Sequence, residues 1–112
     1  MRDCYEVKDL VALAVSEGAT RLILHTGQRP VLFVHGEAHP IEGPAITPDN
    51  ADSLLRSMAG TRYMREFYEQ SLVAFTIRTA SYTVQFRVQA KLVGDEVQID
   101  LDRVGTLPFE FF

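Results

Sequence analysis

The N-terminal part of the chain changes from a helical to an extended pattern of apolar positions. Between Tyr5 and Glu17, apolar residues recur at the i, i+3, i+4, i+7 spacing that forms one buried stripe on a helix. Gly18 follows directly, and glycine readily takes the left-handed conformation that ends many helices. Two short apolar runs, Arg21–Thr26 and Val31–His35, then predict the strands of a β-hairpin.

The hairpin leads into a third strand and then into a helical region. The expected core residues of the hairpin are Leu22, Leu24, Val34 and one of Val31 and Leu32. A third short strand is predicted at Glu37–Ile41. Thr47-Pro48-Asp49 has the features of a helix start, because it offers a capping hydroxyl, a proline for the first turn and an acid near the positive end of the dipole. We expect Gly60 to end this helix and Thr61 to begin a shorter one.

From Leu72 onwards the apolar period is two, which is typical of strands with one buried face. The alternating apolar sets are Val73, Phe75 and Ile77; then Tyr82, Val84, Phe86, Val88, Ala90 and Leu92; then Val97, Ile99 and Leu101. A two-residue turn at Gly94-Asp95 would pair Val88 with Leu101, Ala90 with Ile99, Gln89 with Asp100, Lys91 with Gln98 and Arg87 with Asp102. These elements predict a single α+β domain in which helices pack on one face of an antiparallel sheet.

Composition and charge narrow the classes of partner. The chain has 112 residues, 46% hydrophobic and 23% charged residues, and a net charge of −4, so we expect no nucleic-acid binding. It contains no apolar run of about 18 residues, and its N-terminus lacks the apolar core of a signal peptide. The single cysteine, Cys4, cannot form an internal disulfide, and we therefore expect a cytoplasmic protein.

No constellation of residues in the sequence predicts catalysis. Neither the phosphate-loop motif G-x-x-x-x-G-K-[ST] nor the dinucleotide motif G-x-G-x-x-G is present. The three histidines, His25, His35 and His39, have no cysteine or carboxylate cluster beside them that would complete a metal site. Cys4 has no partner base identifiable from the sequence. We therefore predict no catalytic, cofactor-binding or metal-binding residues.

The order of several short motifs resembles the N-terminal domain of PilT-type ATPases, the type IV pilus retraction motors of the type II/IV secretion ATPase superfamily. That family typically has G-A-S-D-L-H-L, then S-x-G-x-P-P, L-R-x-x-G-E-L, L-x-G-P-x-L-T-P, R-x-E-F, F-R-V-N-x and R-x-I-P. The similar segments here are Gly18–Leu24, Gly27 with Pro30, Gly36-Glu37, Ile41–Pro48, Arg65–Phe67, Phe86–Ala90 and Asp102–Val104. Each motif is weak alone, and their common order is the specific feature.

The sequence also departs from the family pattern. The family's Asp and His in S-D-L-H are Arg21 and Ile23 here, and the Arg of L-R-x-x-G is Phe33. The sequence ends at Phe112, before the position at which the family's RecA-like ATPase domain would begin. The resemblance therefore implies the regulatory and assembly domain of the family and not its ATP hydrolysis.

The resemblance implies a PAS-like domain over residues 1–104 and an apolar tail, 105–112, at the position of the family's interdomain linker. We expect a non-catalytic module that acts through protein–protein contacts, with an ATPase domain or with a second copy as partner. The alternative is a free-standing PAS-like sensor of a small ligand. The candidate partner-interface residues are Arg21, Phe33, Arg87, Phe109, Phe111 and Phe112. A cluster of phenylalanines on a chain end tends to find an apolar surface, so the tail can fold back on its own domain or pack on a second copy. We expect the second arrangement, a homodimer, because the resemblance implies that this surface meets another subunit.

Overall fold

The computed structural model describes residues 5–78 and 84–106, with only the backbone described for 105 and 106. Its elements in chain order are α1 (Val7–Glu17), β1 (Arg21–His25), β2 (Val31–Val34), β3 (Glu37–Pro40), α2 (Pro48–Gln70), β4 (Leu72–Arg78), β5 (Val84–Val93) and β6 (Glu96–Thr106). The predicted α+β class and the predicted order of elements are both confirmed.

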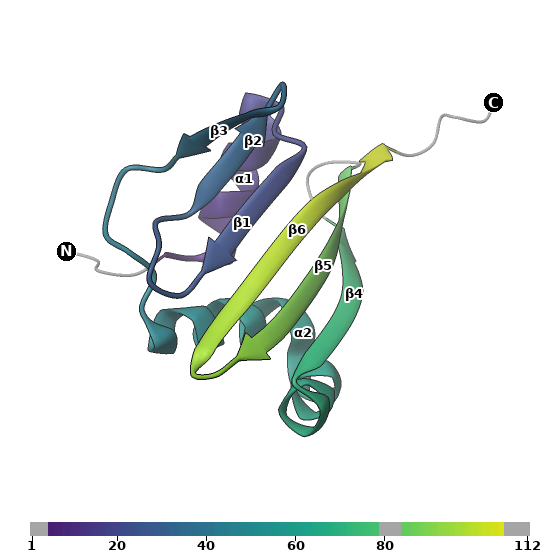
Figure 1. Ribbon diagram of the computed structural model, residues 1–112. Helices are drawn as coiled ribbons and strands as arrows, with labels where there is room; N and C mark the ends of the chain where they lie inside the picture. Colours follow the sequence, from purple (N-terminus) through teal and green to yellow (C-terminus); the bar gives the residue numbers. More distant parts are fainter. Residues whose placement is uncertain (1–4, 79–83, 107–112) are drawn as a thin grey trace.

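The six strands form one sheet in the order β3-β2-β1-β6-β5-β4, and every neighbouring pair is antiparallel. The sheet consists of two three-stranded meanders, β1–β3 and β4–β6, which Figure 1 shows side by side. They are joined where β1 pairs with β6 over the whole length of β1, from Arg21↔Asp102 to His25↔Gln98. The sequence pattern did not predict this junction.

The helix boundaries follow the predicted signals. Gly18 takes a φ of 72°, and its N–H donates to the carbonyl oxygens of Ala14 and Val15 at the end of α1. Thr47 caps α2, since its Oγ1 accepts a hydrogen bond of 3.1 Å from the Asn50 N–H. Gly60 interrupts α2 with a φ of 74° and a ψ of 178°. The two predicted helices are therefore the two limbs of one kinked helix.

The register of the last hairpin is the predicted one. Val93 lies opposite Glu96 about the Gly94-Asp95 turn, and Gly94 has a φ of 65°. The remaining predicted pairs are also confirmed: Arg87↔Asp102, Val88↔Leu101, Gln89↔Asp100, Ala90↔Ile99 and Lys91↔Gln98. The turn between β2 and β3 uses His35 and Gly36, with φ of 53° and 80°, which matches the two left-handed positions of a type I′ hairpin.

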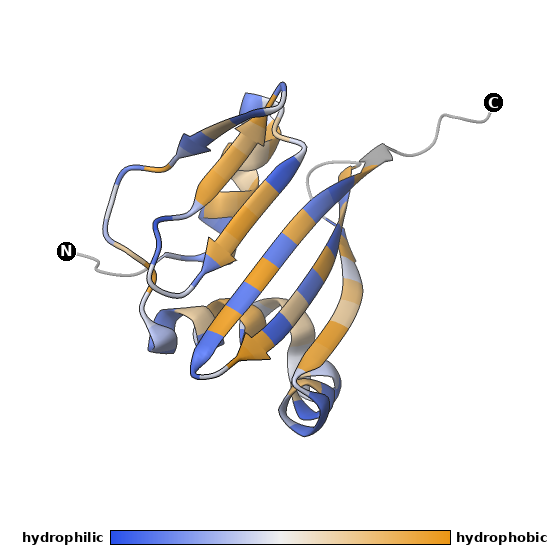
Figure 2. Cartoon of the chain, viewed as in Figure 1, coloured by the Kyte–Doolittle hydropathy of each residue, from blue (hydrophilic) through white to orange (hydrophobic). Residues whose placement is uncertain are grey.

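Both helices lie on the same face of the sheet, behind it in the view of Figure 1. The core between the sheet and the helices is formed by alternate strand residues and the apolar stripes of the helices. Figure 2 shows the corresponding alternation of hydrophobic and hydrophilic residues along β5 and β6. The fully buried large side chains of the core include Leu22, Leu24, Leu54, Leu55, Phe67, Val73, Phe86, Val88, Ile99 and Leu101. In β2 the core residue is Leu32, while Val31 points to the opposite face and is only partly buried.

Some predictions fall on residues that the structure does not describe. Cys4, the predicted strand start at Tyr82, and Phe109, Phe111 and Phe112 all lie outside the described ranges. β6 continues to Thr106, two residues past the predicted domain boundary at 104. No helix within the described residues combines the length and the hydropathy needed to cross a membrane.

We predict that Val88→Asp prevents folding of the domain. Val88 is fully buried between Phe75 of β4 and Leu101 of β6, so the substitution would place an unpaired carboxylate in the core. That penalty is several kcal/mol, comparable with the total stability of about 5–15 kcal/mol for a small domain. Circular dichroism during heating should show no cooperative transition. Thr76→Asp, which places the same carboxylate on the exposed face of β4, should unfold cooperatively, and a folded Val88→Asp variant would contradict the prediction.

Candidate functional site

The candidate site is the face of the sheet that points away from the helices, here called the open face. Along β1 the buried side chains of Leu22 and Leu24 alternate with Arg21, Ile23 and His25, which lie on the open face. The same alternation gives β6 its succession of hydrophilic and hydrophobic residues in Figure 2. An antiparallel sheet with one helix-covered face leaves the other face available to solvent or to a partner.

Three predicted interface residues share one row of this face. Phe33 of β2 lies opposite Arg21 of β1, Arg21 lies opposite Asp102 of β6, and Asp102 lies opposite Arg87 of β5. The row therefore crosses four neighbouring strands in the order Phe33, Arg21, Asp102 and Arg87. Their contact with a partner stays a prediction.

Asp102 forms its ion pair with β1 and not with β5. The Arg21 Nε donates to the Asp102 Oδ1 at 2.7 Å, and this hydrogen bond, together with the charge of Asp102, raises the pKa of the Arg21 guanidinium. Arg87 occupies the predicted position opposite Asp102, yet within the described residues it forms no ion pair. Sequence reasoning missed the Arg21–Asp102 pair because the pairing of β1 with β6 gives no local signal.

A second polar pair continues along the same junction. The His25 Nε2 lies 2.9 Å from the Asp100 Oδ1, and His25 is the only one of the three histidines on β1. His35 occupies the β2–β3 turn, and the His39 Nε2 lies 3.6 Å from the Glu37 Oε1 at the sheet edge. In residues 5–78 and 84–106, no three His, Cys, Asp or Glu side chains are grouped as they would be around a metal ion.

The open face has an apolar half and a basic half. On β1 and β2, Ile23, Val31 and Phe33 are partly exposed and form an apolar half. On the other side, Arg78 of β4 and Arg87 and Lys91 of β5 lie among uncharged side chains. Such a surface can bind a partner through apolar contacts at one end and charge attraction at the other.

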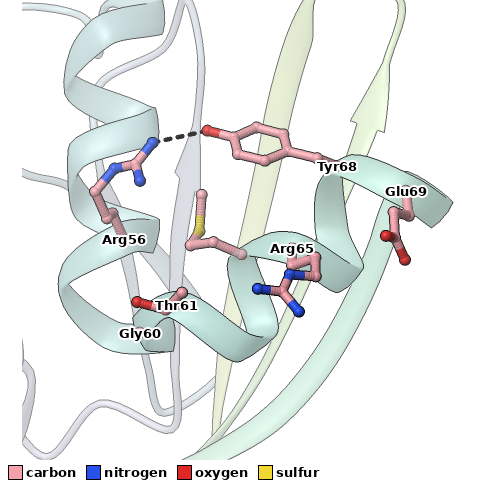
Figure 3. Close-up of a pocket in the computed structure, with 7 residues that line it drawn as sticks. Arg56, Gly60, Thr61, Arg65, Tyr68 and Glu69 are labelled. Carbon is pink, nitrogen blue, oxygen red and sulfur yellow. Dashed lines mark hydrogen bonds between the residues drawn. The ribbon is translucent and has the colours of Figure 1, made fainter.

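A separate pocket of about 650 Å³ lies at the kink of α2. Figure 3 shows Arg56 from the first limb facing Tyr68 from the second, with Gly60 and Thr61 at the corner between them. The Arg56 Nη2 donates to the Tyr68 Oη at 2.8 Å and to Asp52 Oδ2 at 3.0 Å. Tyr68 in turn donates to Asp52 Oδ1 at 2.7 Å, so the two limbs are connected by a closed triangle of hydrogen bonds.

This triangle shifts two pKa values in opposite directions. Burial raises the pKa of the Asp52 carboxyl, but the hydrogen bonds from Tyr68 and Arg56 and the charge of Arg56 outweigh it, and the net pKa is lowered. The hydrogen bond to Asp52, with some burial, raises the pKa of the Tyr68 phenol. The sequence could not reveal this cluster, because Asp52 and Tyr68 are brought together only by the kink.

Known structures resemble the chain in fold. No protein-family model matches the sequence, and no curated protein sequence matches it. The crystal structure of the pilus retraction motor PilT with bound ADP matches 95% of this chain with a TM-score of 0.79 and 20% identity. The ATPase DotB of Legionella pneumophila matches 96% with a TM-score of 0.80 and 18% identity. DotB of Yersinia pseudotuberculosis matches 94% with a TM-score of 0.76 and 14% identity.

The fold is that of the N-terminal domain of PilT-like ATPases. The resemblance stated from the motifs is therefore confirmed at the level of fold. The chain spans only 30% of the PilT chain and 31% and 32% of the two DotB chains. Their ATPase domain is not covered by the match.

We predict that Arg21 contributes more than Arg87 to the stability of this PilT-type fold. Arg21→Ala removes the exposed ion pair with Asp102 and should cost about 0.2–1 kcal/mol. Arg87→Ala removes no ion pair within the described residues and should change stability by less than about 0.5 kcal/mol. Urea unfolding of both variants measures the difference. A larger loss for Arg87→Ala would show that Asp102 pairs with β5 in solution.

We predict that Tyr68→Phe lowers the free energy of unfolding of the domain between about pH 4 and pH 10. The variant loses the hydrogen bond to Asp52, which at this exposed position is worth about 0.5–1 kcal/mol. The lowered pKa of Asp52 means that its contribution is present above the ordinary carboxyl value of about 4 and is lost as the pH falls through the folded value. The raised pKa of Tyr68 gives a contribution that is lost as the pH rises from about 10 through the folded value. Urea unfolding of both proteins at pH 2.5, 7 and 11 tests this, and an equal difference at all three would contradict it.

Proposed function

We propose that the chain is a non-catalytic assembly or regulatory domain that acts, like an N-terminal domain of a PilT-type ATPase, through protein–protein contacts. The observation that carries the proposal is the open face, where Phe33, Arg21, Asp102 and Arg87 form one row across four strands. A fold that resembles one part of larger ATPases supports a role in contact with other domains. The absence of a phosphate-loop motif from the sequence supports a non-catalytic role.

The composition of the open face suits a reversible protein interface. Phe33 is an aromatic side chain that is already partly buried by its neighbours, so it loses little conformational entropy when a partner covers it. Arg21 beside it is held in place by Asp102. Aromatic residues and arginines are the side chains most often found at the energetic centre of interfaces.

We propose the ATPase domain of a PilT-type protein in the cytoplasm as the partner, with a second copy of this chain as the competing arrangement. The sensor alternative has less support. Phe67, Phe86 and Ile99 are fully buried in one cluster between the sheet and the helices. In a PAS-like sensor this space would hold the small ligand. We therefore favour a contact module.

The test is a calorimetric titration of the full chain into a PilT-type ATPase domain from the same genome, produced without its own N-terminal domain. We expect saturable binding and a change in the ATP turnover of that domain. Phe33→Gln and Arg21→Glu should each weaken binding by about tenfold or more, equivalent to roughly 1.4 kcal/mol. Thermal unfolding checks that both variants remain folded.

Lys8→Glu is the matched control, because Lys8 is an exposed cation on α1, on the opposite side of the sheet from the open face. It should bind the ATPase domain as tightly as the original chain does.

Sedimentation across a concentration series tests the competing arrangement, in which the partner is a second copy of this chain. Self-association that Phe33→Gln abolishes would identify a second copy as the partner. A chain that neither binds the ATPase domain nor self-associates would overturn the proposal.

A further inference from the structure

The two edges of the sheet are differently protected against pairing with another chain. β3, at one edge, has four residues, begins with a charged glutamate and ends with Pro40, which has no N–H to donate. β4, at the other edge, has seven residues, from Leu72 to Arg78. Short strands, prolines and charges are the usual means of blocking an edge, and β3 has all of them.

β4 has almost none of these protections. It pairs with β5 in an uninterrupted register from Leu72↔Lys91 to Arg78↔Gln85, and it contains no proline and no charge before Arg78. Within the described residues, no backbone hydrogen bond connects β4 with a strand other than β5. Its outer edge therefore offers a row of main-chain donors and acceptors to an additional strand.

The surroundings of this edge are basic, although the whole chain has a net charge of −4. β4 and β5 contain Arg78, Arg87 and Lys91 and no acidic residue. All three cations lie on the open face, in register with Gln85, Thr76 and Leu72 across the β4–β5 pair. By contrast, the two aspartates of β6 form pairs with β1, Asp102 with Arg21 and Asp100 with His25.

The side chains of β4 define what an additional strand would meet. On the open face, Ala74 and Thr76 are small and exposed, so a glutamate on the incoming strand could extend over them towards Arg87, two strand spacings or about 10 Å away. On the helix side, Ile77 is partly buried and Phe75 stacks on Tyr63 of α2, with ring centroids 5.0 Å apart. This side would receive apolar side chains.

We propose that the β4 edge binds an extended segment of a partner protein in which acidic residues alternate with apolar ones. The segment would add a seventh strand to the sheet, with its carboxylates towards Arg78, Arg87 and Lys91 and its apolar residues beside Phe75 and Tyr63. Main-chain hydrogen bonds would supply affinity, and the alternation would supply specificity. This surface is distinct from the Phe33–Arg21 end of the open face, so it can be tested separately from the proposed function.

The probe is a short fluorescein-labelled peptide in which glutamate alternates with valine, titrated with the full chain and followed by fluorescence anisotropy. The control peptide alternates lysine with valine. We expect saturable binding of the glutamate peptide only, weakened by added salt. Amide hydrogen exchange followed by NMR should show new protection in Leu72–Arg78 and none in Glu37–Pro40.

A matched pair of variants tests the charge requirement at the edge. Thr76→Glu should weaken binding of the glutamate peptide by about tenfold, because it places a like charge beside the incoming carboxylates. Thr76→Lys should bind it at least as well as the original chain, and Ala38→Glu, on the β3 edge, should leave binding unchanged. Thermal unfolding verifies that each variant is folded.

Three results would overturn the proposal. The first is equal binding of the two peptides, and the second is equal binding by Thr76→Glu and Thr76→Lys. The third is protection of Leu72–Arg78 that rises with protein concentration in the absence of peptide, since the occupant would then be a second copy of this chain. Phe33→Gln should leave peptide binding intact, which separates this result from the test of the proposed function.

Discussion

The pairing of β1 with β6 is the contact on which the rest of the structure depends, because it converts two separate meanders into one sheet. Each meander has only three strands, and a small sheet is stable only when its apolar face is covered. Pairing Leu22 with Leu101 and Leu24 with Ile99 makes the two apolar faces continuous, so that α1 and α2 cover one shared core. The same pairing places Arg21 beside Asp102 and His25 beside Asp100 on the opposite face. One ladder of hydrogen bonds thus fixes both the core and the polar centre of the open face.

The sequence allowed the elements and the local hairpins to be predicted, and it failed where partners are distant in the chain. The β5–β6 register follows from a two-residue turn and a strict apolar alternation, both of which are local. The kink at Gly60 also has a local cause, since glycine accepts a φ of 74° that other residues resist. The Arg21–Asp102 bond joins residues 81 positions apart, and no period or turn residue specifies such a contact. The candidate site was therefore predicted as separate residues, Arg21, Phe33 and Arg87, without the row that unites them.

The kinked helix shows how one backbone irregularity supports the whole sheet. A straight helix of 23 residues could follow only one direction across the twisted strands, whereas the two limbs of α2 change direction at Gly60. Leu54 and Leu55 enter the core from the first limb, and Phe67 enters it from the second. The bonds among Asp52, Arg56 and Tyr68 join the limbs on the solvent side. The pocket at the kink therefore has a structural explanation that needs no ligand.

The residues that form the core differ from those that form the open face, because strand side chains alternate between the two sides of the sheet. The core positions require only apolar side chains of fitting volume, which is compatible with a TM-score of 0.79 to PilT at 20% identity. The open-face positions carry no such restriction, so their charges and aromatic groups can vary while the fold is kept.

Arg21 and Phe33 on the open face are examples of this variation, because the family motifs have an acid and a base at these two positions. An aspartate at position 21 would face Asp102 across the strand pair, a repulsion that the present arginine replaces with a hydrogen bond. The charge of the open face along this junction is thus set jointly by β1 and β6.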